Sequence, residues 1–381
     1  MKILIIGGGI SGLAVALALH RTGQQVTVFE RSQAIQEVGA GLTIWPNAIR
    51  VLQELGLTNV IPEIGMPAHY RTIRTWRGAL LSQIEVDAIA GSPMRLMHRA
   101  DLQGALFNAL RDASIPVELG ARCTGFSQDE NGVHAQFADG RTADGDLLVG
   151  ADGIRSVVRG QLFGIPNIHY TGYTSWRGIA EVDARYIPLG ISSETWGVGR
   201  RIGLIPLRNG RMYWFAAYTT PEGQGKDQSS AERKQEVQEL FRGWHDPIEP
   251  ILEATDRSRI LRNDVYDIAP LAHWSQGRVV LVGDAAHAMS PNMGQGGCQA
   301  IEDAPVLAQC IQASADIPTA LHAYEARRKP RTSRVARQSR RIGQLSQVNN
   351  PQLYPVRNIL VKALYTRALS KELKWLLQST I

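Results

Sequence analysis

The first 30 residues most constrain the fold, because an apolar run leads through a glycine-rich turn into a second apolar segment. The sequence MKILIIGGGISGLAVALALH places Gly7, Gly9 and Gly12 in the spacing G-x-G-x-x-G. Apolar runs of this length on both sides of a glycine turn predict a buried strand, a helix and a second strand. The expected elements are Lys2–Ile6, Ile10–Arg21 and Gln25–Glu30. Such a unit is typical of a parallel sheet covered by helices.

The three glycines and an acid further along the chain predict a dinucleotide site. Gly7 permits a tight turn, Gly9 lets the backbone approach a pyrophosphate, and Gly12 lets the helix pack closely on the strand. Glu30 lies 18 residues beyond Gly12, where a carboxylate binds ribose hydroxyls. An acid there repels a 2′-phosphate, so the expected dinucleotide is FAD or NAD rather than NADP. The alternative, a glycine-rich turn without a ligand, is disfavoured because strand, helix and acid all stand in the required places.

A second glycine-rich stretch, GDAAHAMSPNMGQGG, begins directly after the apolar run Val279–Val282. Asp284 stands at the carboxyl end of this predicted strand, where open α/β sheets bind ligands, and its carboxylate can accept hydrogen bonds from sugar or ribityl hydroxyls. Gly294–Gly297 precede a predicted helix over Gln299–Cys310. The N–H groups at that helix start favour an anionic group, such as the pyrimidine edge of a reduced isoalloxazine.

The cysteine positions and the charge distribution limit the classes of protein to which the chain can belong. Cys123, Cys298 and Cys310 are far apart and form no C-x-x-C pair, so neither a disulfide framework nor a metal site is expected, and a reducing cytoplasm fits. The net charge is +6, but residues 321–381 hold 13 Lys/Arg and 2 Asp/Glu, a local +11 that leaves −5 elsewhere. A solvated basic helix face is the preferred interpretation. No zinc-finger, RNA-binding or basic-zipper signature accompanies the charge, so nucleic acid is not an expected partner.

The remaining segments fall into two kinds. Strand-like runs split by turn residues fill Tyr170–Asp267 and predict a mainly antiparallel sheet with one helix at Ala231–Trp244. Outside this insert, DGDLLVGADG and GRVVLVGDAA each read as a strand that runs into a polar turn. Further helices are expected over Asn47–Leu55, Ala100–Arg111, Ile301–Cys310, Ala320–Arg341 and Asn358–Leu377. Strand ends near Gly7, Asp152 and Asp284 are thus expected to converge on one ligand.

Three motifs together carry a resemblance to a known family. GGGISG, GADGIRSVVR and GDAAHAMSPNMGQGG occur in the family's order between residues 7 and 297. They resemble the fingerprints of the p-hydroxybenzoate-hydroxylase-like class A flavoprotein monooxygenases, and the chain is most similar to urate-hydroxylase-like and zeaxanthin-epoxidase-like members. The implied fold class is α/β: a Rossmann-like FAD-binding domain, an inserted mainly antiparallel β-sheet substrate domain and a C-terminal helical region. The expected bounds are 1–70, 96–165 and 277–345 for the FAD-binding domain, 71–95 and 166–276 for the substrate domain, and 346–381 for the helical segment.

The resemblance implies a set of cofactor-binding residues. The ADP half of FAD is held by Gly7, Gly9, Gly12, Glu30 and Arg31. Phosphate or ribityl oxygens are contacted by Arg99, in HRADLQ, and by Gln103 one helical turn further. An Asp-Gly pair associated with both FAD and NAD(P)H is matched by Asp152 and Gly153, and the ribityl chain is bound by Asp284. The flavin ring is flanked by Pro291, Gly294, Gly296 and Gly297, with Gly39–Gly41 on its other side. For Arg99 the alternative is a surface ion pair.

The resemblance also implies an activity. In the family FAD stays bound, NADH or NADPH binds transiently and reduces it, and O₂ adds at the flavin C4a carbon to give a hydroperoxide that oxygenates the substrate. The expected substrate is a small electron-rich aromatic or heteroaromatic compound, or a conjugated alkene, and the expected reaction is hydroxylation or epoxidation. Two alternatives stay open: a non-oxygenating FAD-dependent dehydrogenase or reductase, and a flavin-binding adaptor without turnover.

The run RRIGLIPLRNGRMYWFAAY predicts a β-hairpin, because Asn-Gly stands between apolar runs. By resemblance to urate-hydroxylase-like relatives, Arg201 and Tyr213 are candidate substrate contacts and therefore candidate catalytic residues; a scaffold role is the alternative. A two-residue loop pairs positions whose numbers sum to 419 and sends the two side chains to opposite faces. A three-residue loop, Arg208–Gly210 with Gly210 in the left-handed conformation, makes the sum 418 and pairs Tyr213 with Ile205. We predict the three-residue loop, because this register places Arg201 on the same face as Tyr213.

Several other polar and aromatic side chains are expected to serve the scaffold. His287 is expected to orient its loop through a hydrogen bond rather than to act as a general base. Cys298 needs no redox role, since a small buried apolar residue fits there. Packing is likewise the preferred role of Trp45, Trp176 and Trp214, with an aromatic substrate pocket as the alternative.

The expected C-terminal helix is amphipathic. Its apolar stripe consists of Ile359, Leu360, Leu364, Leu369, Leu373 and Leu376, and its basic residues are Arg357, Lys362, Arg367, Lys371 and Lys374. Docking on the protein's own body is the preferred interpretation, and peripheral membrane contact is the alternative. No stretch of the sequence reaches the ~18 apolar residues of a membrane span. A monomer or a homodimer is expected.

Overall fold

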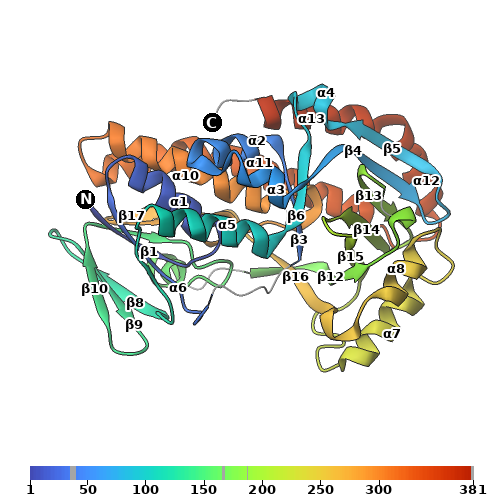
Figure 1. Ribbon diagram of the computed structural model, residues 1–381, viewed down its shortest axis with the longest axis horizontal. Helices are drawn as coiled ribbons and strands as arrows, with labels where there is room; N and C mark the ends of the chain where they lie inside the picture. Colours follow the sequence, from blue (N-terminus) through green and yellow to red (C-terminus); the bar gives the residue numbers. More distant parts are fainter. Residues whose placement is uncertain (35–39, 165–167, 187, 379–381) are drawn as a thin grey trace.

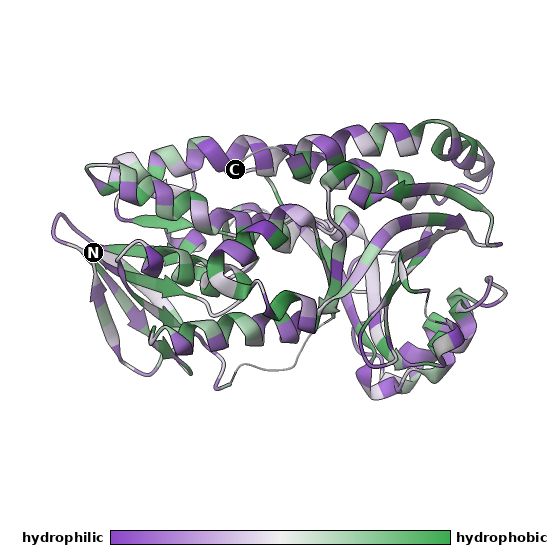
Figure 2. Ribbon diagram, turned by 45° about the horizontal axis from the view of Figure 1, so that its top comes forward, coloured by the Kyte–Doolittle hydropathy of each residue, from purple (hydrophilic) through white to green (hydrophobic). Residues whose placement is uncertain are grey.

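The computed structural model describes residues 1–34, 40–164, 168–186 and 188–378, with the side chain of Ala184 left out. Two large sheets lie towards opposite ends of the long axis, and long helices run along one side of both (Figure 1). The strands of the parallel sheet are mostly hydrophobic, whereas the long helices carry hydrophobic and hydrophilic residues in alternation (Figure 2). This alternation is what helices need when one face covers a sheet and the other meets water.

The first sheet has six strands in the order β17-β18-β11-β1-β2-β7. They are β1 (Lys2–Ile6), β2 (Gln25–Phe29), β7 (Val117–Glu118), β11 (Leu147–Gly150), β17 (Ser275–Gln276) and β18 (Val279–Leu281). Pairing is parallel except between β17 and β18. Ile6 pairs with Gly150 and Phe29, and Gly150 pairs with Leu281, so four carboxyl ends stop level with one another. The strands predicted at 2–6, 25–30 and within 144–153 and 277–286 are confirmed.

Helices cover this parallel sheet. They are α1 (Ile10–Arg21), α2 (Pro46–Leu52), α5 (Arg99–Asp112), α6 (Val157–Phe163), α10 (Gly296–Ala313) and α11 (Ile317–Ser346). Helix α1 packs on α5 and α10, and α10 packs on α11. α1 is almost entirely apolar and buried along its length, because both the sheet and its helical neighbours surround it. The predicted helices at these places are confirmed, with ends that differ by a few residues.

The second sheet has nine strands in the order β16-β12-β15-β14-β13-β4-β6-β3, with β5 paired to β4. They are β3 (Gly41–Ile44), β4 (Met66–Thr75), β5 (Leu80–Glu85), β6 (Met94–His98), β12 (Ile168–Glu181), β13 (Gly190–Trp196), β14 (Arg200–Pro206), β15 (Arg211–Thr219) and β16 (Leu261–Ile268). Only β4 and β13 pair in parallel, so the mainly antiparallel sheet is confirmed. β3 lies within residues 1–70, so this sheet also draws on a segment that the predicted division places in the FAD-binding domain.

The far face of this sheet has its own apolar core. Helices α7 (Ser230–Leu240) and α8 (Ile248–Ala254) pack over Trp176, Trp214 and their neighbours. The prediction of one helix in the insert is therefore wrong, because α8 follows α7. Seven residues, with Pro250 in the first turn, are too few to show a helical period in the sequence. Trp45, Trp176 and Trp214 are all buried, in agreement with packing roles.

The remaining elements are short or lie near the C-terminus. They are a three-stranded sheet of β8 (Cys123–Gln128), β9 (Val133–Phe137) and β10 (Thr142–Gly145), the helices α3 (Val60–Ile64), α4 (Val86–Ala90) and α9 (Asp284–His287), the π-helical turns η1 (Gln53–Leu57) and η5 (Val361–Tyr365), the single 3₁₀ turns η2 (Ala184–Tyr186), η3 (Arg257–Arg259) and η4 (Pro291–Met293), and the C-terminal helices α12 (Leu353–Leu360) and α13 (Thr366–Gln378). Within the described ranges, no helix is long and apolar enough to cross a bilayer.

Candidate active site

The level carboxyl ends of the parallel strands create the site. The turn after β1 starts at Gly7, the turn after β11 holds Asp152, β2 is followed by Glu30, and β18 leads to Asp284. These positions are separated by up to 277 residues in sequence, since 284 − 7 = 277, yet they share one edge of the sheet. Open parallel sheets bind ligands at this edge. The structure brings these strand ends to one edge, as expected, and a ligand shared by all of them stays a prediction.

The glycine turn is shaped by close backbone contacts. Gly7 has φ +114, and a Cβ placed on it would overlap the carbonyl of Ala151. A Cβ on Gly12 would overlap the carbonyl of Gly7, so the helix can approach the strand only with glycine there. A Cβ on Gly9 meets nothing within 4 Å, which leaves this side of the turn open to an approaching group. These are the three properties that the sequence spacing predicts.

Polar side chains brace the glycine turn. The carboxylate of Glu30 accepts hydrogen bonds from the N–H groups of Gly8 (2.7 Å) and Ser32 (2.9 Å). Gln103 Nε2 donates to the carbonyl of Gly8 (2.8 Å), so Gln103 lies against the turn. Arg31 is exposed just beyond β2. The residues assigned to the ADP half therefore lie together at one end of this edge.

Arg99 and Gly41 connect this edge to the second sheet. Arg99 opens α5 with an exposed side chain, and its N–H donates to the carbonyl of Ala40 (3.0 Å). A Cβ on Gly41 would overlap the ring of Tyr213, so Gly41 permits β3 to lie against that tyrosine. Gly39, the other glycine of the expected pair, lies outside the described residues.

The turns that hold Asp152 and Asp284 are tied together by an arginine. One carboxylate oxygen of Asp152 accepts from the N–H of Val157 (2.7 Å) at the start of α6. From α6, Arg159 donates to the carbonyl of Ala285 (2.8 Å) and to that of Ile154. Asp284 is the first residue of α9, and its side chain is exposed at the edge. Arg159 was not singled out from the sequence, although it is the last residue of the motif GADGIRSVVR.

The loop between β18 and α10 brings the third motif to the same edge. Gly283 has φ +57, and a Cβ there would lie 2.6 Å from Ser11 Oγ of α1. Pro291 starts the 3₁₀ turn, and Gly294 follows it with φ +65. Gly296 and Gly297 are the first residues of α10 and are half-buried. A Cβ on Gly297 meets nothing within 4 Å, so the N–H groups at this helix start are not crowded by neighbouring atoms.

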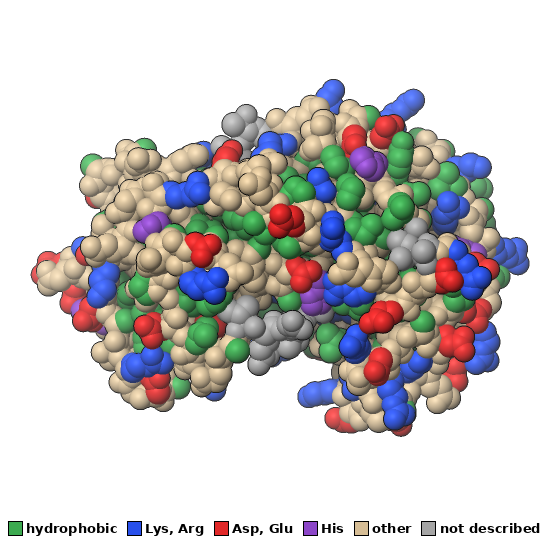
Figure 3. Space-filling view, in the orientation of Figure 1, with side chains coloured by type: hydrophobic (Ala, Val, Ile, Leu, Met, Phe, Trp, Pro, Cys, Tyr) green, Lys and Arg blue, Asp and Glu red, His purple; other side chains and the backbone are tan. Residues whose placement is uncertain are grey.

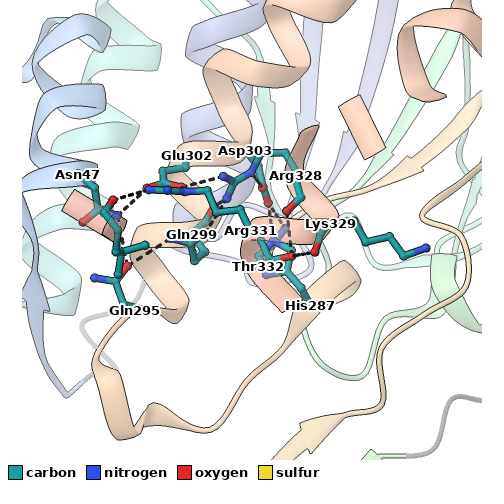
Figure 4. Close-up of polar contacts among 12 residues, drawn as sticks. Asn47, His287, Gln295, Gln299, Glu302, Asp303, Arg328, Lys329, Arg331 and Thr332 are labelled. Carbon is teal, nitrogen blue, oxygen red and sulfur yellow. Dashed lines mark hydrogen bonds and ion pairs between the residues drawn. The ribbon is translucent and has the colours of Figure 1, made fainter. Parts of the chain in front are cut away.

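A buried ionic network supports this loop from behind (Figure 4). Arg328 of α11 contacts the carboxylates of Glu302 and Asp303 of α10, at 2.7 Å each. Asp303 also accepts from the N–H of Gly283 (2.8 Å) and lies 2.7 Å from His287 Nε2. All but His287, which is 7 % exposed, are fully buried. The hydrogen bond that was predicted to let His287 orient the loop is thus confirmed.

The same network reaches the start of α10 and the C-terminal helix. Asn47 Nδ2 donates to Glu302 (2.6 Å) and to Gln295 Oε1 (3.2 Å), directly before the first turn of α10. Arg331 contacts Glu302 (2.7 Å) and donates to the carbonyl of Leu376 in α13 (2.7 Å). The C-terminus of α13 is therefore linked through two buried charges to the loop that the flavin is expected to meet.

The two acids of the network stay ionised. Burial raises the pKa of Glu302, but Arg328 and Arg331 outweigh it, and the net pKa lies below the ordinary value. Burial likewise raises the pKa of Asp303, but His287 and Arg328 outweigh this effect and leave the pKa below its ordinary value. Charges this deep are tolerated only because each carboxylate is both paired and hydrogen-bonded.

Buried polar atoms along the edge provide a test of whether FAD fits. Ser11 Oγ, Trp45 Nε1, Asp152 Oδ1 and Gln295 Nε2 are among those that have no hydrogen-bond partner within the described residues. Buried donors and acceptors in folded proteins normally have partners. A hydroxyl, an indole N–H, a carboxylate oxygen and an amide NH₂ match the phosphates, ribityl hydroxyls and pyrimidine carbonyls of FAD. The residues present therefore fit FAD.

The hairpin of β14 and β15 presents the candidate substrate residues on one face. Ile205 pairs with Tyr213 and Arg201 with Ala217, which is the register of the three-residue loop, and Gly210 has φ +69. The predicted register is confirmed. Phe215 lies between the two candidates: its ring centroid is 6.5 Å from that of Tyr213 and 5.9 Å from the guanidinium carbon of Arg201. The three side chains form one row rather than a direct Arg201–Tyr213 contact.

Arg201 is held in a buried polar cluster. It contacts Glu194 of β13 (2.7 Å) and donates to Asn292 Oδ1, from the third motif. Arg71 of β4 shares the same carboxylate at 3.2 Å. Burial alone raises the pKa of Glu194, but Arg201 and Arg71 outweigh it and leave the pKa below its usual value. Because Tyr173 also donates to Asn292 (3.0 Å), Asn292 joins the nine-stranded sheet to the loop between β18 and α10.

Sequence reasoning missed most members of these clusters. Asn292 and Gln295 stand inside a quoted motif, so their polar character next to the glycines was an available signal. Glu302, Asp303 and Arg328 gave no such signal, because charges in helices are usually solvated. Among the described residues, no group of His, Cys, Asp and Glu side chains has an arrangement suited to a metal ion.

These features define an α/β protein of the FAD-binding type, whose parallel sheet has a glycine turn and buried polar atoms that fit FAD at its carboxyl edge. The family model described as FAD binding domain matches residues 1–339, and the chain belongs to that family.

The relatives are monooxygenases. The chain is 43% identical to the aurachin C monooxygenase/isomerase of Stigmatella aurantiaca, over 95% of this chain and 94% of that protein. It is 34% identical to the FAD-dependent urate hydroxylase of Klebsiella pneumoniae, over 90% and 89% of the two chains. The crystal structure of Klebsiella pneumoniae HpxO complexed with FAD and uric acid superposes with a TM-score of 0.91 at 31% identity, covering 99% and 96% of the chains. The protein is thus a class A FAD-dependent monooxygenase, as the motifs indicated, and NAD(P)H is the reductant typical of this class.

Proposed function

We propose that the protein hydroxylates or epoxidises a small aromatic, heteroaromatic or conjugated compound that carries a hydrogen-bond acceptor, with O₂ as the oxygen source. Two relatives act on aurachin C and on urate, by their names, which supports oxygenation of an organic small molecule. The row of Tyr213, Phe215 and Arg201 offers two aromatic rings and one guanidinium on a single sheet face.

The observation that carries the proposal is the state of Arg201. The residue is 2 % exposed, and its Nε has no hydrogen-bond partner among the described residues. Arg201 and Arg71 share the single carboxylate of Glu194, so the cluster keeps one positive charge. A buried donor next to a surplus positive charge favours a carbonyl or anionic oxygen of a ligand.

We propose the following roles for the cofactor-binding residues. The ADP half is held by Gly7, Gly9, Gly12, Glu30 and Arg31. Arg99 and Gln103 contact phosphate or ribityl oxygens, Asp152 serves both FAD and NAD(P)H, and Asp284 binds the ribityl chain. The flavin ring is surrounded by Gly41, Pro291, Gly294, Gly296 and Gly297. When bound, FAD supplies the redox chemistry with NAD(P)H and O₂. The chain's own task is to hold the substrate against that edge and to exclude water.

Tyr213 is proposed as a neutral contact. Burial raises the pKa of its phenol to about 12, so the group keeps its proton at physiological pH. It can donate a hydrogen bond to a substrate oxygen but does not serve as a base. Its ring also packs on Gly41, which fixes its position relative to β3.

The cellular setting is a further part of the proposal. We place the enzyme in the cytoplasm as a monomer or homodimer, and its three buried free thiols support a reducing compartment. A non-oxygenating FAD-dependent dehydrogenase is the rival function. It predicts substrate-stimulated NAD(P)H oxidation without oxygen in the product.

The first experiment measures NAD(P)H oxidation in air with NADH and NADPH, alone and with aurachin C, urate, 3-amino-4-hydroxybenzoate and simple phenols. Peroxide and ¹⁸O incorporation from ¹⁸O₂ are followed together. Stimulated oxidation, little peroxide and labelled product are expected for a substrate. Stimulated oxidation with unlabelled product would instead support the dehydrogenase.

The second experiment tests Arg201. Arg201→Gln keeps a hydrogen-bonding side chain but removes the charge, and kcat/KM is expected to fall about 10-fold or more, in line with a lost charged hydrogen bond. Arg208→Gln is the matched control, because Arg208 is an exposed residue of the same hairpin. Flavin content should stay unchanged in both variants. Equal kcat/KM in the two variants would exclude a substrate role for Arg201.

A further inference from the structure

The outer side of α12 and η5 is an exposed apolar surface. Of eleven large hydrophobic side chains that are exposed among the described residues, five lie here: Leu353 (53%), Val356 (53%), Ile359 (67%), Leu360 (49%) and Leu364 (61%). We call these five residues the α12 surface. Single exposed apolar residues are normal on proteins, but a contiguous group on one helix marks a contact site.

The spacing makes one continuous stripe. Leu353, Val356, Leu360 and Leu364 follow each other by three or four residues, so they share one helix face. The stripe continues into Arg367 and Lys371, which are also exposed. An apolar face that passes into basic residues is the arrangement of helices that lie in the interface of an anionic bilayer.

The surrounding chain is basic without interruption. Residues 326–371 contain 12 Lys/Arg and no Asp or Glu. Several of these are paired or buried, but Arg341, Lys362, Arg367 and Lys371 are exposed near the α12 surface in sequence. The space-filling view shows hydrophobic and basic side chains next to each other at the end of the molecule where α12 lies (Figures 1 and 3).

The helix is fixed from its inner side, so the apolar side chains cannot turn inwards. Buried Arg357 donates to the carbonyls of Gly197 (3.0 Å) and Ser346 (3.3 Å). Val361 and Tyr365 of η5 are buried. The predicted apolar stripe therefore divides: Leu369, Leu373 and Leu376 dock on the protein, as preferred from the sequence, whereas Ile359, Leu360 and Leu364 do not.

We propose that the α12 surface inserts into the interface of an anionic lipid bilayer, with Lys362, Arg367 and Lys371 near the headgroups. A second copy of the chain is the other possible occupant, but a symmetric contact would bring two basic segments together, and like charges would oppose it. α12 lies at one end of the long axis, and β1 and α1 lie towards the other (Figure 1).

The test is flotation of the FAD-bound full chain with two kinds of vesicle: pure phosphatidylcholine, and an equal mixture of phosphatidylcholine and phosphatidylglycerol. Point variants are needed, because removing α13 would break the contacts of Arg331 and Arg50 with its last carbonyls. The double variant Ile359→Gln/Leu364→Gln removes apolar contact, and Leu189→Gln, at a 74% exposed leucine elsewhere, is the matched control.

The wild type and Leu189→Gln are expected to float with the anionic vesicles only, and added salt should release them. Ile359→Gln/Leu364→Gln should bind the anionic vesicles at least about 10-fold more weakly than the wild type. Each basic residue near an anionic membrane strengthens binding about fivefold. Arg367→Gln/Lys371→Gln, which removes two of them, should therefore bind about 25-fold more weakly than the wild type. No flotation, or equal flotation of wild type and the apolar double variant, would overturn the proposal. So would a dimer in sedimentation velocity that Ile359→Gln/Leu364→Gln abolishes while lipid binding is absent.

Discussion

Asp284 is one of three acidic residues at the carboxyl edge of the parallel sheet, together with Glu30 and Asp152. It follows Gly283, whose φ of +57 sets the turn, and its own carboxylate is exposed where a ribityl chain would pass. Asp284→Ala is expected to weaken FAD binding about 10-fold or more, since one or two hydrogen bonds to a charged acceptor are lost. The measurement is flavin absorbance per protein after gel filtration. Asp112→Ala, at an exposed surface acid, is the control, and full flavin occupancy in Asp284→Ala would refute the role.

Gly41 offers a second test at the same scale. A Cβ there overlaps the Tyr213 ring and approaches its Cβ within 2.8 Å, and a ring held in a central strand cannot move aside easily. Gly41→Ala is expected to cost about 1–3 kcal/mol of unfolding free energy through overpacking and to lower kcat/KM as Tyr213 shifts. Gly104→Ala, in α5 where an added Cβ meets nothing within 4 Å, should instead be neutral or stabilising. The measurement is urea unfolding of both variants. Equal unfolding midpoints for Gly41→Ala and Gly104→Ala would mean that the sheet makes room for the added Cβ.

Helices α10 and α11 are joined by charge rather than by apolar packing alone. Glu302 pairs with Arg328 and Arg331 and accepts from Asn47, all buried. Glu302→Gln should lower the unfolding free energy by about 3–5 kcal/mol, because two buried guanidinium groups lose their partner. Glu372→Gln removes the same charge from a partly exposed pair with Arg334 and should cost at most about 1 kcal/mol. Similar losses in both variants would show that the buried network does not stabilise the fold.

Elements that depend on local sequence were predictable, and contacts between elements were not. The glycine turn predicted β1 and α1 with their observed bounds, because both elements follow from neighbouring residues. The register of the hairpin was predicted from the condition that Arg201 and Tyr213 share one face, and the observed pairing agrees with it. Asn47 and Glu302 are 255 residues apart, and no periodicity in either segment points to the other. The same holds for Asn292, whose contact with Arg201 joins the loop after β18 to the nine-stranded sheet. Strand ends could be placed at one edge because parallel topology brings them there, whereas side-chain partners needed the folded chain.

Across the whole molecule, buried carboxylates paired with arginines make stability depend on acid pH. In Glu194, Glu302 and Asp303, burial acts to raise the pKa, but the neighbouring positive charges prevail and each pKa lies below its ordinary value. Free carboxylates titrate at about pH 4–4.5. For a depressed pKa, the contribution to stability is complete above the unfolded value and is lost as pH falls through the folded value. The unfolding free energy should therefore be level near neutrality and fall below about pH 4.5.

The buried network lets this expectation be tested group by group. Urea midpoints of wild type and Glu302→Gln are compared from pH 7 down to about pH 3.5. The variant starts lower at pH 7, but its curve should fall less steeply in acid, because one of the carboxylates that takes up a proton on unfolding is gone. The two curves would then converge as pH decreases. Parallel curves would show that Glu302 titrates alike in the folded and unfolded chains, and the network would then stabilise the loop behind Gly283 by geometry rather than by charge.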